Sequence, residues 1–346
     1  MRRLPIIKIL LMGLVLLVSL PLQAAHPFKA FKDISWAKPK GFDLTTDIYV
    51  PDTDVKNLPV LIIYHGGGWL INTKSIMNDM ARYMASHADL VVVNMNYRLL
   101  GDLDNTTTAN EIVEDALGAV LWVKDNIKKY NGDPSRIAVT GDSAGGHLAA
   151  MVVLAGRQLE SDGFKGKTPG FKPVYLPPGK TAEQIAKEDG EAVQAAILSY
   201  AALSMLTAAK DGFETADNPF WGWAKASPRG IFGKGISIES NPEFYDAVSP
   251  MHYIVARKDY KLPPQFVLVG EQDTLIKPEM VANYVALLKK AGQPVEMKVY
   301  KNRGHAYLDS GCNDYTQGCF KDLAVPTLDD MIKFLDKVFA APRSGA

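Results

Sequence analysis

The pentapeptide Gly141-Asp142-Ser143-Ala144-Gly145 places a serine between a predicted strand at 136–140 and an Ala-rich predicted helix at 144–154. A strand that turns directly into a helix strains the backbone of the central serine, and glycines on either side avoid collisions there. The hydroxyl then projects at the carboxyl end of the strand, beside a helix N-terminus that favours negative charge. The motif is short, so its strand–turn–helix context carries the prediction that Ser143 is a nucleophile.

A second glycine-rich segment, His65-Gly66-Gly67-Gly68-Trp69, follows the apolar run 60–64. Glycine lets the backbone approach a bound group closely and turn its N–H groups toward it. When a nucleophile attacks an acyl carbon, negative charge builds on the carbonyl oxygen, and such N–H groups stabilise that charge. A flexible surface turn is the alternative interpretation, and the pairing of this segment with the serine motif argues against it.

The candidate general base is His305. A serine hydroxyl needs a base to remove its proton, and histidine can do this near neutral pH. Of the six histidines, His305 stands in Gly304-His305-Ala306-Tyr307, just after a predicted strand at 295–300. His147 falls one helical turn after Ser143, so we expect it to pack or to steer its neighbours.

A carboxylate is expected to orient this histidine and to stabilise its charged form. Asp273 directly follows the predicted strand at 265–269, which gives the chain order serine, aspartate, histidine. Glu271 is the competing carboxylate. Asp142, adjacent to the serine, is expected to have a structural role.

The elements that must position these residues alternate along the chain. The predicted strands are 42–50, 60–64, 90–94, 136–140, 193–198, 265–269 and 295–300, and the predicted helices are 111–129, 144–154, 278–290 and 328–339. Continuous apolar strands suit burial on both faces. The alternation predicts the α/β class, with a mostly parallel central sheet covered by helices on both faces. With the serine motif, it indicates an α/β-hydrolase fold in a single domain at 26–346.

Two stretches interrupt this alternation, at about 157–192 and 203–253. Uninterrupted loops of this length are usually functional or disordered. We interpret the second as a cap or a pocket wall, with a purely structural surface insertion as the alternative. Trp221 and Trp223 in this stretch, together with Trp69, are candidate substrate-binding residues, although large aromatic side chains more often pack in a core.

The N-terminus has the features of a secretory signal peptide. Arg2, Arg3 and Lys8 precede an apolar run at 9–18, and Ala24 and Ala25 offer small residues for cleavage. An uncleaved anchor is the alternative, but the run is short for a membrane span. We therefore expect residues 1–25 to be removed and the mature chain to be secreted or periplasmic.

Export favours a disulfide between the two cysteines, Cys312 and Cys319, with two free thiols as the alternative. No cysteine–histidine spacing suggests a zinc site, and the predicted chemistry needs no metal or organic cofactor. The formal net charge is zero, which argues against a nucleic-acid partner or an anionic membrane surface. The expected partner is a small-molecule or carbohydrate ester. No feature of the sequence predicts the oligomeric state.

Taken together, the glycine loop 65–69 and the serine motif followed by Gly146 resemble the hormone-sensitive-lipase-like esterases. The segment Asn96-Tyr97-Arg98-Leu99 resembles an Asp-Tyr-Arg-Leu stretch of that group, with Asn96 in place of the acid. Gly146-His147-Leu148-Ala149-Ala150 departs from the group. It is closer to the related esterases that deacetylate xylan or cleave feruloyl esters, the BD-FAE-like carboxylesterases. The resemblance covers about 42–155 and 245–340 and fails across 157–245.

The resemblance implies that the N–H groups of Gly67, Gly68 and Ala144 bind the oxyanion. It also implies a serine carboxylic ester hydrolase that works through an acyl-enzyme intermediate, on small acyl or carbohydrate and aryl esters. Two alternatives stay open. Amidases and peptidases share the fold, and a non-catalytic binding protein could use the same scaffold.

Overall fold

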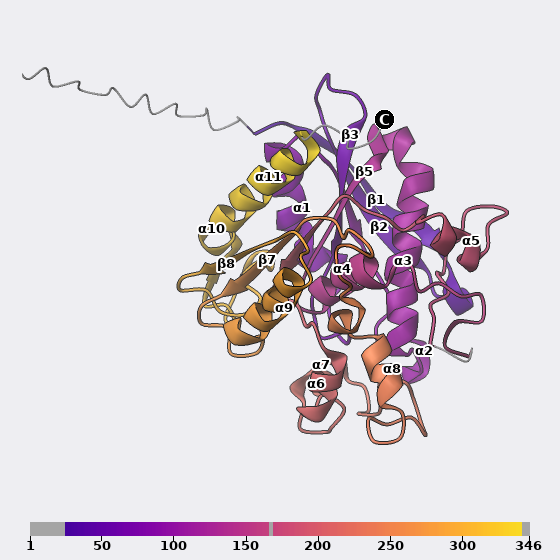
Figure 1. Ribbon diagram of the computed structural model, residues 1–346. Helices are drawn as coiled ribbons and strands as arrows, with labels where there is room; N and C mark the ends of the chain where they lie inside the picture. The colour runs from indigo at the N-terminus through magenta and orange to yellow at the C-terminus, as the bar shows by residue number, and fades with distance from the viewer. Residues whose placement is uncertain (1–24, 166–168, 341–346) are drawn as a thin grey trace, which may run out of the picture.

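The computed structural model describes residues 25–165 and 169–340, so nearly all of the expected signal peptide lies outside the described residues. Within them, eight strands form one sheet in the order β1-β2-β4-β3-β5-β6-β7-β8 (Figure 1). The strands are β1 (Phe28–Ala37), β2 (Leu44–Pro51), β3 (Leu58–Tyr64), β4 (Val91–Met95), β5 (Gly132–Asp142), β6 (Ala195–Ser199), β7 (Gln265–Gly270) and β8 (Val295–Tyr300). Strands β1 and β2 pair antiparallel, and the pairs from β4 to β8 are parallel. The predicted mostly parallel α/β fold is confirmed.

Helices cover both faces of this sheet. On one face, α3 (Ala109–Asn126) packs on α4 (Ala144–Ala155), and α9 (Pro278–Lys290) packs on β7 and β8. On the other face, α1 (Asn78–His87) contacts α11 (Val325–Ala340). The shorter helices are α2 (Asp102–Asn105), α5 (Ala182–Lys187), α6 (Met205–Lys210), α7 (Pro219–Ala224), α8 (Pro242–Ala247) and α10 (Phe320–Leu323).

Helix α3 shows how local sequence sets an element's limits. Thr108 and Glu111 form a capping box at its N-terminus, which satisfies two backbone N–H groups that have no partner within the helix. The 3₁₀ turn that follows it ends at Asn131, whose φ of 65° is left-handed. Asparagine tolerates this conformation better than most residues, and the chain turns there into β5.

The core lies in the central strands. All residues of β4 and β6 are buried, as is every residue of β3 except Pro59. Each large apolar side chain buried in this way contributes roughly 1.5–3 kcal/mol relative to its exposed state. A sheet buried on both faces is rigid, so the loops at its carboxyl edge start from fixed positions.

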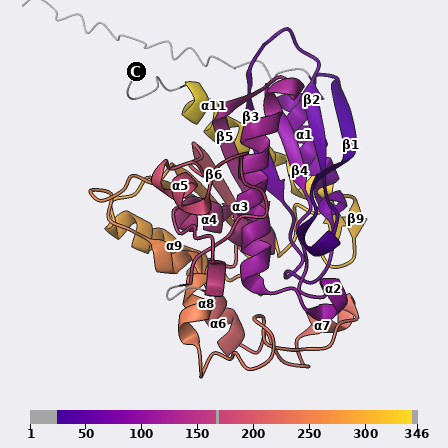
Figure 2. The same ribbon diagram turned by 90° about the vertical axis from the view of Figure 1, so that its right-hand side faces the viewer.

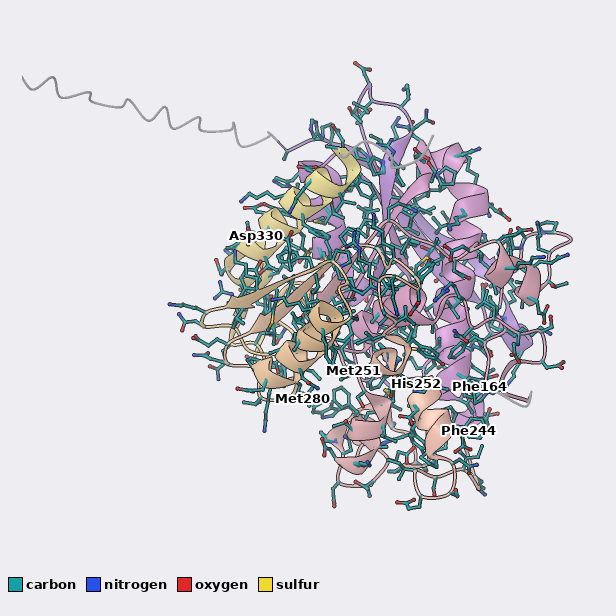
Figure 3. The ribbon with its side chains drawn as sticks, in the orientation of Figure 1. Phe164, Phe244, Met251, His252, Met280 and Asp330 are labelled. Atoms are coloured by element: carbon teal, nitrogen blue, oxygen red, sulfur yellow. A yellow bond between two sulfur atoms is a disulfide. The ribbon has the colours of Figure 1, made fainter. Side chains whose placement is uncertain are left out.

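Both stretches that interrupt the predicted alternation lie outside the sheet. The first carries α5, and the second carries α6, α7 and α8, which lie at the lower end of the molecule in both ribbon views (Figures 1 and 2). The two stretches meet where the rings of Phe164 and Phe244 stack with centroids 5.4 Å apart (Figure 3). Arg229 ties the second stretch to the loop after β4, because its guanidinium donates to the carbonyls of Leu100, Asn105 and Thr107.

A disulfide joins Cys312 to Cys319, as predicted, and closes a hairpin of β9 (Cys312–Asn313) and β10 (Gly318–Cys319). The base of the hairpin is fixed to α1, since the Gly311 N–H donates to the Asp79 carboxylate at 2.9 Å. Over the described ranges, none of the helices has the length and apolar character needed to cross a membrane.

Candidate active site

The turn between β5 and α4 holds Ser143 in a strained conformation, with φ 51° and ψ −115°. The residues two positions before and after it, Gly141 and Gly145, must be glycine for steric reasons. A Cβ on Gly145 would lie 2.0 Å from the carbonyl oxygen of Tyr64, and one on Gly141 would lie 2.3 Å from the carbonyl carbon of Gly145. The Ser143 N–H donates to the Ser199 carbonyl at 2.9 Å, which fixes the turn against β6.

Three residues that are far apart in the sequence meet at this turn. The Ser143 Oγ lies 2.9 Å from Nε2 of His305, and Nδ1 of His305 lies 2.8 Å from Oδ2 of Asp273. The other oxygen of Asp273 accepts the N–H groups of Leu275 (3.0 Å) and Ile276 (2.8 Å). The competing carboxylate, Glu271, is exposed and accepts the backbone N–H of Asn302 at 3.4 Å.

These contacts define the proton positions. An ionised carboxylate only accepts, so Nδ1 of His305 donates to Asp273, and Nε2 is left to accept the Ser143 hydroxyl proton. All three residues are buried, with Ser143 7% and His305 9% exposed. The arrangement can therefore take a proton from the serine and hold the resulting imidazolium charge beside a carboxylate.

The glycine loop lies beside the serine turn because β3 and β5 pair in parallel, with Tyr64 opposite Gly141. Gly67 (φ 124°) and Gly68 (φ 57°) both have backbone conformations that favour glycine. In the part of the chain that the structure describes, no protein acceptor takes the N–H of Gly67 or Gly68. The N–H of Ala144, the first residue of α4, has no acceptor within its own helix. The three predicted donors therefore belong to neighbouring segments at one edge of the sheet.

A layer of buried polar groups supports the glycine loop. The Gly66 N–H donates to the Asp142 carboxylate, and burial raises the pKa of Asp142 to about 6. The Tyr97 hydroxyl donates to the His65 carbonyl at 2.6 Å, and its ring stacks on the His65 imidazole. Burial lowers the pKa of His65 to about 4, so this imidazole stays neutral. Asp142 thus contacts the backbone of the neighbouring loop, which is a structural role.

The three tryptophans singled out from the sequence occupy different environments. Trp221 is fully buried, and its indole N–H donates to the Phe213 carbonyl at 2.7 Å. Trp69 is also buried, whereas Trp223 is 56% exposed. Only Trp223 of the three presents a large part of its ring to solvent, while Trp221 packs inside the insertion.

Sequence reasoning missed Phe220, which borders the glycine loop. Its ring occupies the space beside Gly68, where a Cβ would lie 2.7 Å from the Phe220 Cδ1 atom. It also contacts Trp223 edge to face, with ring centroids 5.1 Å apart. The cluster Phe220-Trp221-Gly222-Trp223 could have drawn attention to it, but nothing in the sequence connects this cluster to residue 68.

Known proteins similar to this chain include esterases. It is 29% identical over 273 residues to carboxylesterase NlhH of Mycobacterium tuberculosis, covering 78% of this chain and 74% of that protein. It is 28% identical over 292 residues to esterase LipI of the same species, covering 84% and 78%. The apo form of Thermogutta terrifontis esterase 2 has the same fold, with a TM-score of 0.62, 23% identity and coverage of 93% of this chain and 98% of that chain.

The fold, the site and these relatives define a carboxylic ester hydrolase of the α/β-hydrolase class. Within that class, the chain belongs to the BD-FAE family, whose model matches residues 46–286. The match includes the glycine loop, the serine turn, the Asp273 loop and the whole 203–253 insertion. It ends before the segment that carries His305.

Proposed function

We propose that the chain hydrolyses carboxylic esters through a Ser143–His305–Asp273 triad and an acyl-enzyme intermediate. The observation that carries this proposal is the continuous hydrogen-bonded path from the Ser143 hydroxyl through His305 to Asp273, at 2.9 and 2.8 Å. Ser143 Oγ attacks the acyl carbon while His305 takes its proton and then passes it to the leaving alcohol. A water molecule, deprotonated by His305, releases the acid and restores the serine.

The oxyanion of each tetrahedral intermediate binds the N–H groups of Gly67, Gly68 and Ala144. Support comes from the strained, glycine-only backbone at 67 and 68, and from N–H groups there that no protein acceptor uses. Donors held in place before the reaction stabilise the developing charge without reorganising, which is often the largest single contribution to catalysis.

The substrate class that best fits is an ester with a small acyl group and an aryl or carbohydrate alcohol. Phe220 packs against Gly68, one of the proposed oxyanion donors, and contacts Trp223, whose ring is exposed. Thermogutta terrifontis esterase 2, which shares the fold, has been solved with propionate and with butyrate bound. A flat aromatic surface suits either an aryl ring or the apolar face of a sugar.

The triad is tested with Ser143→Ala, measured on p-nitrophenyl acetate and by labelling with a fluorophosphonate. We expect kcat/KM to fall by at least about 10⁴-fold and labelling to disappear. Labelling that persists in Ser143→Ala would place the nucleophile elsewhere. A matching anilide, assayed beside the ester, distinguishes an esterase from an amidase: faster turnover of the anilide would overturn the ester assignment.

The acid of the triad has a matched control in the neighbouring carboxylate. Asp273→Asn should lower kcat by about 10⁴-fold because it disturbs the histidine tautomer. Glu271→Gln, two residues away and exposed, should leave kcat within about twofold. The reverse pattern would assign the triad acid to Glu271.

Export through the predicted signal peptide is part of the proposal. The basic residues and apolar run before Ala25, together with the Cys312–Cys319 disulfide, support it. Expression of the full chain in a bacterium, followed by N-terminal sequencing of the extracytoplasmic fraction, should give a chain that starts just after residue 24 or 25. A chain found only in the cytoplasm with its first residues intact would contradict export.

A further inference from the structure

His147 is buried, and both of its ring nitrogens have partners that fix the position of its proton. Its Nδ1 lies 3.2 Å from the indole nitrogen of Trp69, and its Nε2 lies 2.7 Å from the carbonyl oxygen of Val248. An indole N–H can only donate and a carbonyl oxygen can only accept. The imidazole is therefore neutral, with its proton on Nε2. Burial lowers the pKa of His147 to about 4, which is consistent with this state.

The two partners belong to different parts of the molecule. Trp69 follows Gly68 directly in the glycine loop, and Val248 ends α8 in the 203–253 insertion. His147 itself lies one turn along α4 from Ser143, and its backbone N–H donates to the Ser143 carbonyl at 3.0 Å. One side chain thus connects the glycine loop, the nucleophile helix and the insertion.

The glycine loop needs such a connection because its backbone is strained. Trp69 has a φ of 59°, a left-handed conformation that costs a bulky residue roughly 1–2 kcal/mol. The Trp69 ring meets the His147 ring edge to face, with centroids 5.2 Å apart, and meets the Phe213 ring in the same way at 5.4 Å. The Trp69 carbonyl also accepts the Leu100 N–H at 2.8 Å. These contacts hold in place the residue next to the Gly68 amide.

We propose that His147 is a positioning residue for the oxyanion site. It fixes Trp69, and through it the Gly67 and Gly68 amides, and it links their placement to the insertion through Val248. The inference rests on the proposed function, because it assigns these amides to the oxyanion. Its consequence is that the insertion acts on transition-state stabilisation as well as on substrate contact.

The test replaces His147 with Phe, which keeps a ring of similar size but removes both hydrogen bonds, and with Gln, whose carboxamide offers an acceptor oxygen and a donor NH2 group. Active-site concentration is fixed by fluorophosphonate titration. We then measure kcat and KM for p-nitrophenyl acetate, together with Ki for a methyl trifluoromethyl ketone, which forms an oxyanion on the serine. Displaced oxyanion donors weaken binding of the transition state more than binding of the substrate.

For His147→Phe we expect kcat to fall about 10- to 100-fold and Ki to rise by a similar factor, with KM changed less than about threefold. His147→Gln should recover part of both losses. His252→Phe is the matched control, because His252 is exposed on the same insertion (Figure 3), and both constants should stay within about twofold.

A role limited to packing would lower the melting temperature while kcat and Ki of His147→Phe stay within twofold of wild type, and that result overturns the proposal. If His147→Phe does not fold, Trp69→Phe removes the indole N–H that donates to Nδ1 and keeps an aromatic ring at this position. It should lower kcat and raise Ki about 3- to 10-fold, and unchanged constants would again overturn the proposal. Failure of the proposed function is distinguishable, because the wild-type chain itself would then show no ester turnover and no labelling at Ser143.

Discussion

The catalytic edge, formed by the loop 65–69 and the turn 141–145, differs from the 203–253 insertion in what fixes its structure. At the catalytic edge, backbone meets backbone: a Cβ at Gly145 would lie 2.0 Å from a carbonyl oxygen. In the insertion, Gly222 does not have a positive φ, and a Cβ there would meet nothing within 4 Å. Where backbone contacts backbone, only glycine fits. Where side chains determine the packing, as in the insertion, many combinations of residues can fill the same space. Functional residues at the catalytic edge can therefore be recognised from short sequence motifs, whereas those in the insertion cannot.

The largest expected effect tests this contrast with one substitution in each region. Gly145→Ala should abolish activity and destabilise the chain severely, because backbone atoms of Tyr64 cannot move away without disturbing the central sheet. Gly222→Ala adds the same methyl group inside α7 and should stabilise the chain slightly, by at most about 1 kcal/mol. Urea unfolding and ester turnover measure both.

If Gly222→Ala proved as damaging as Gly145→Ala, the insertion would be as constrained as the catalytic edge. The contrast between the two regions would then be lost. A folded and active Gly145→Ala variant would also contradict this contrast, because the turn would then have to open to accommodate the added methyl group.

The second contrast lies inside the insertion, between two tryptophans two residues apart. Trp221→Ala should lower the free energy of unfolding by about 3–5 kcal/mol, because it opens a cavity and leaves the Phe213 carbonyl without its donor. Trp223→Ala should change that free energy by no more than about 0.5 kcal/mol. It should instead raise KM for aryl esters several-fold if its exposed ring contacts the alcohol group.

The measurements are urea unfolding and a KM series over p-nitrophenyl and alkyl acetates. Equal losses of stability would mean that Trp223 packs in solution as Trp221 does. An unchanged KM for every ester would remove Trp223 from the substrate-binding site.

The same contrast explains which elements of the fold can be predicted from the sequence. The buried strands were found because continuous apolar runs leave few alternatives, and the serine turn was found because its glycines are required by geometry. Strand β1 was missed because it is a largely exposed edge strand with bulges near Phe31 and Ser35, so its apolar residues do not alternate regularly. Helix α1 was missed too, although its core face holds Met80, Ala81, Met84 and Ala85.

In the site, the triad candidates could be named because each directly follows a predicted strand. The contacts of Phe220 with Gly68 and of Val248 with His147 join residues about 150 and 100 positions apart. No local pattern records such pairs, since many aromatic side chains could fill the first contact and any residue has the carbonyl that makes the second. Tertiary packing alone specifies them.

The third prediction concerns acid stability and compares the two buried histidines, His65 in the catalytic edge and His147 at its border with the insertion. Burial lowers the folded-state pKa of each to about 4, below the ordinary value of 6.5. Between these values the unfolded chain binds the proton and the folded chain does not. The stability that each neutral histidine contributes is therefore present above pH 6.5 and is lost as pH falls toward 4, by up to about 3 kcal/mol.

Buried Asp142, whose pKa is raised to about 6, acts in the opposite direction over the same range, so single histidines must be isolated by substitution. The difference in unfolding free energy between wild type and His65→Gln should shrink by up to about 3 kcal/mol from pH 7 to pH 4. The same holds for His147→Gln. A difference that does not vary with pH would mean that the imidazole is already solvated in the folded chain.

The smallest effect on activity is expected in the Cys312–Cys319 hairpin, which lies outside both the catalytic edge and the insertion. Because the bond closes a short loop, the double replacement Cys312→Ser with Cys319→Ser should lower the free energy of unfolding by about 2–3 kcal/mol. At 25 °C, kcat for a short-chain ester should stay within about twofold, since the hairpin base is also held to α1 by Asp79. Dithiothreitol should lower the melting temperature of the wild type to that of the double variant and leave the variant unaffected. A large fall in kcat without loss of stability would instead show that the hairpin, like the insertion, takes part in substrate binding.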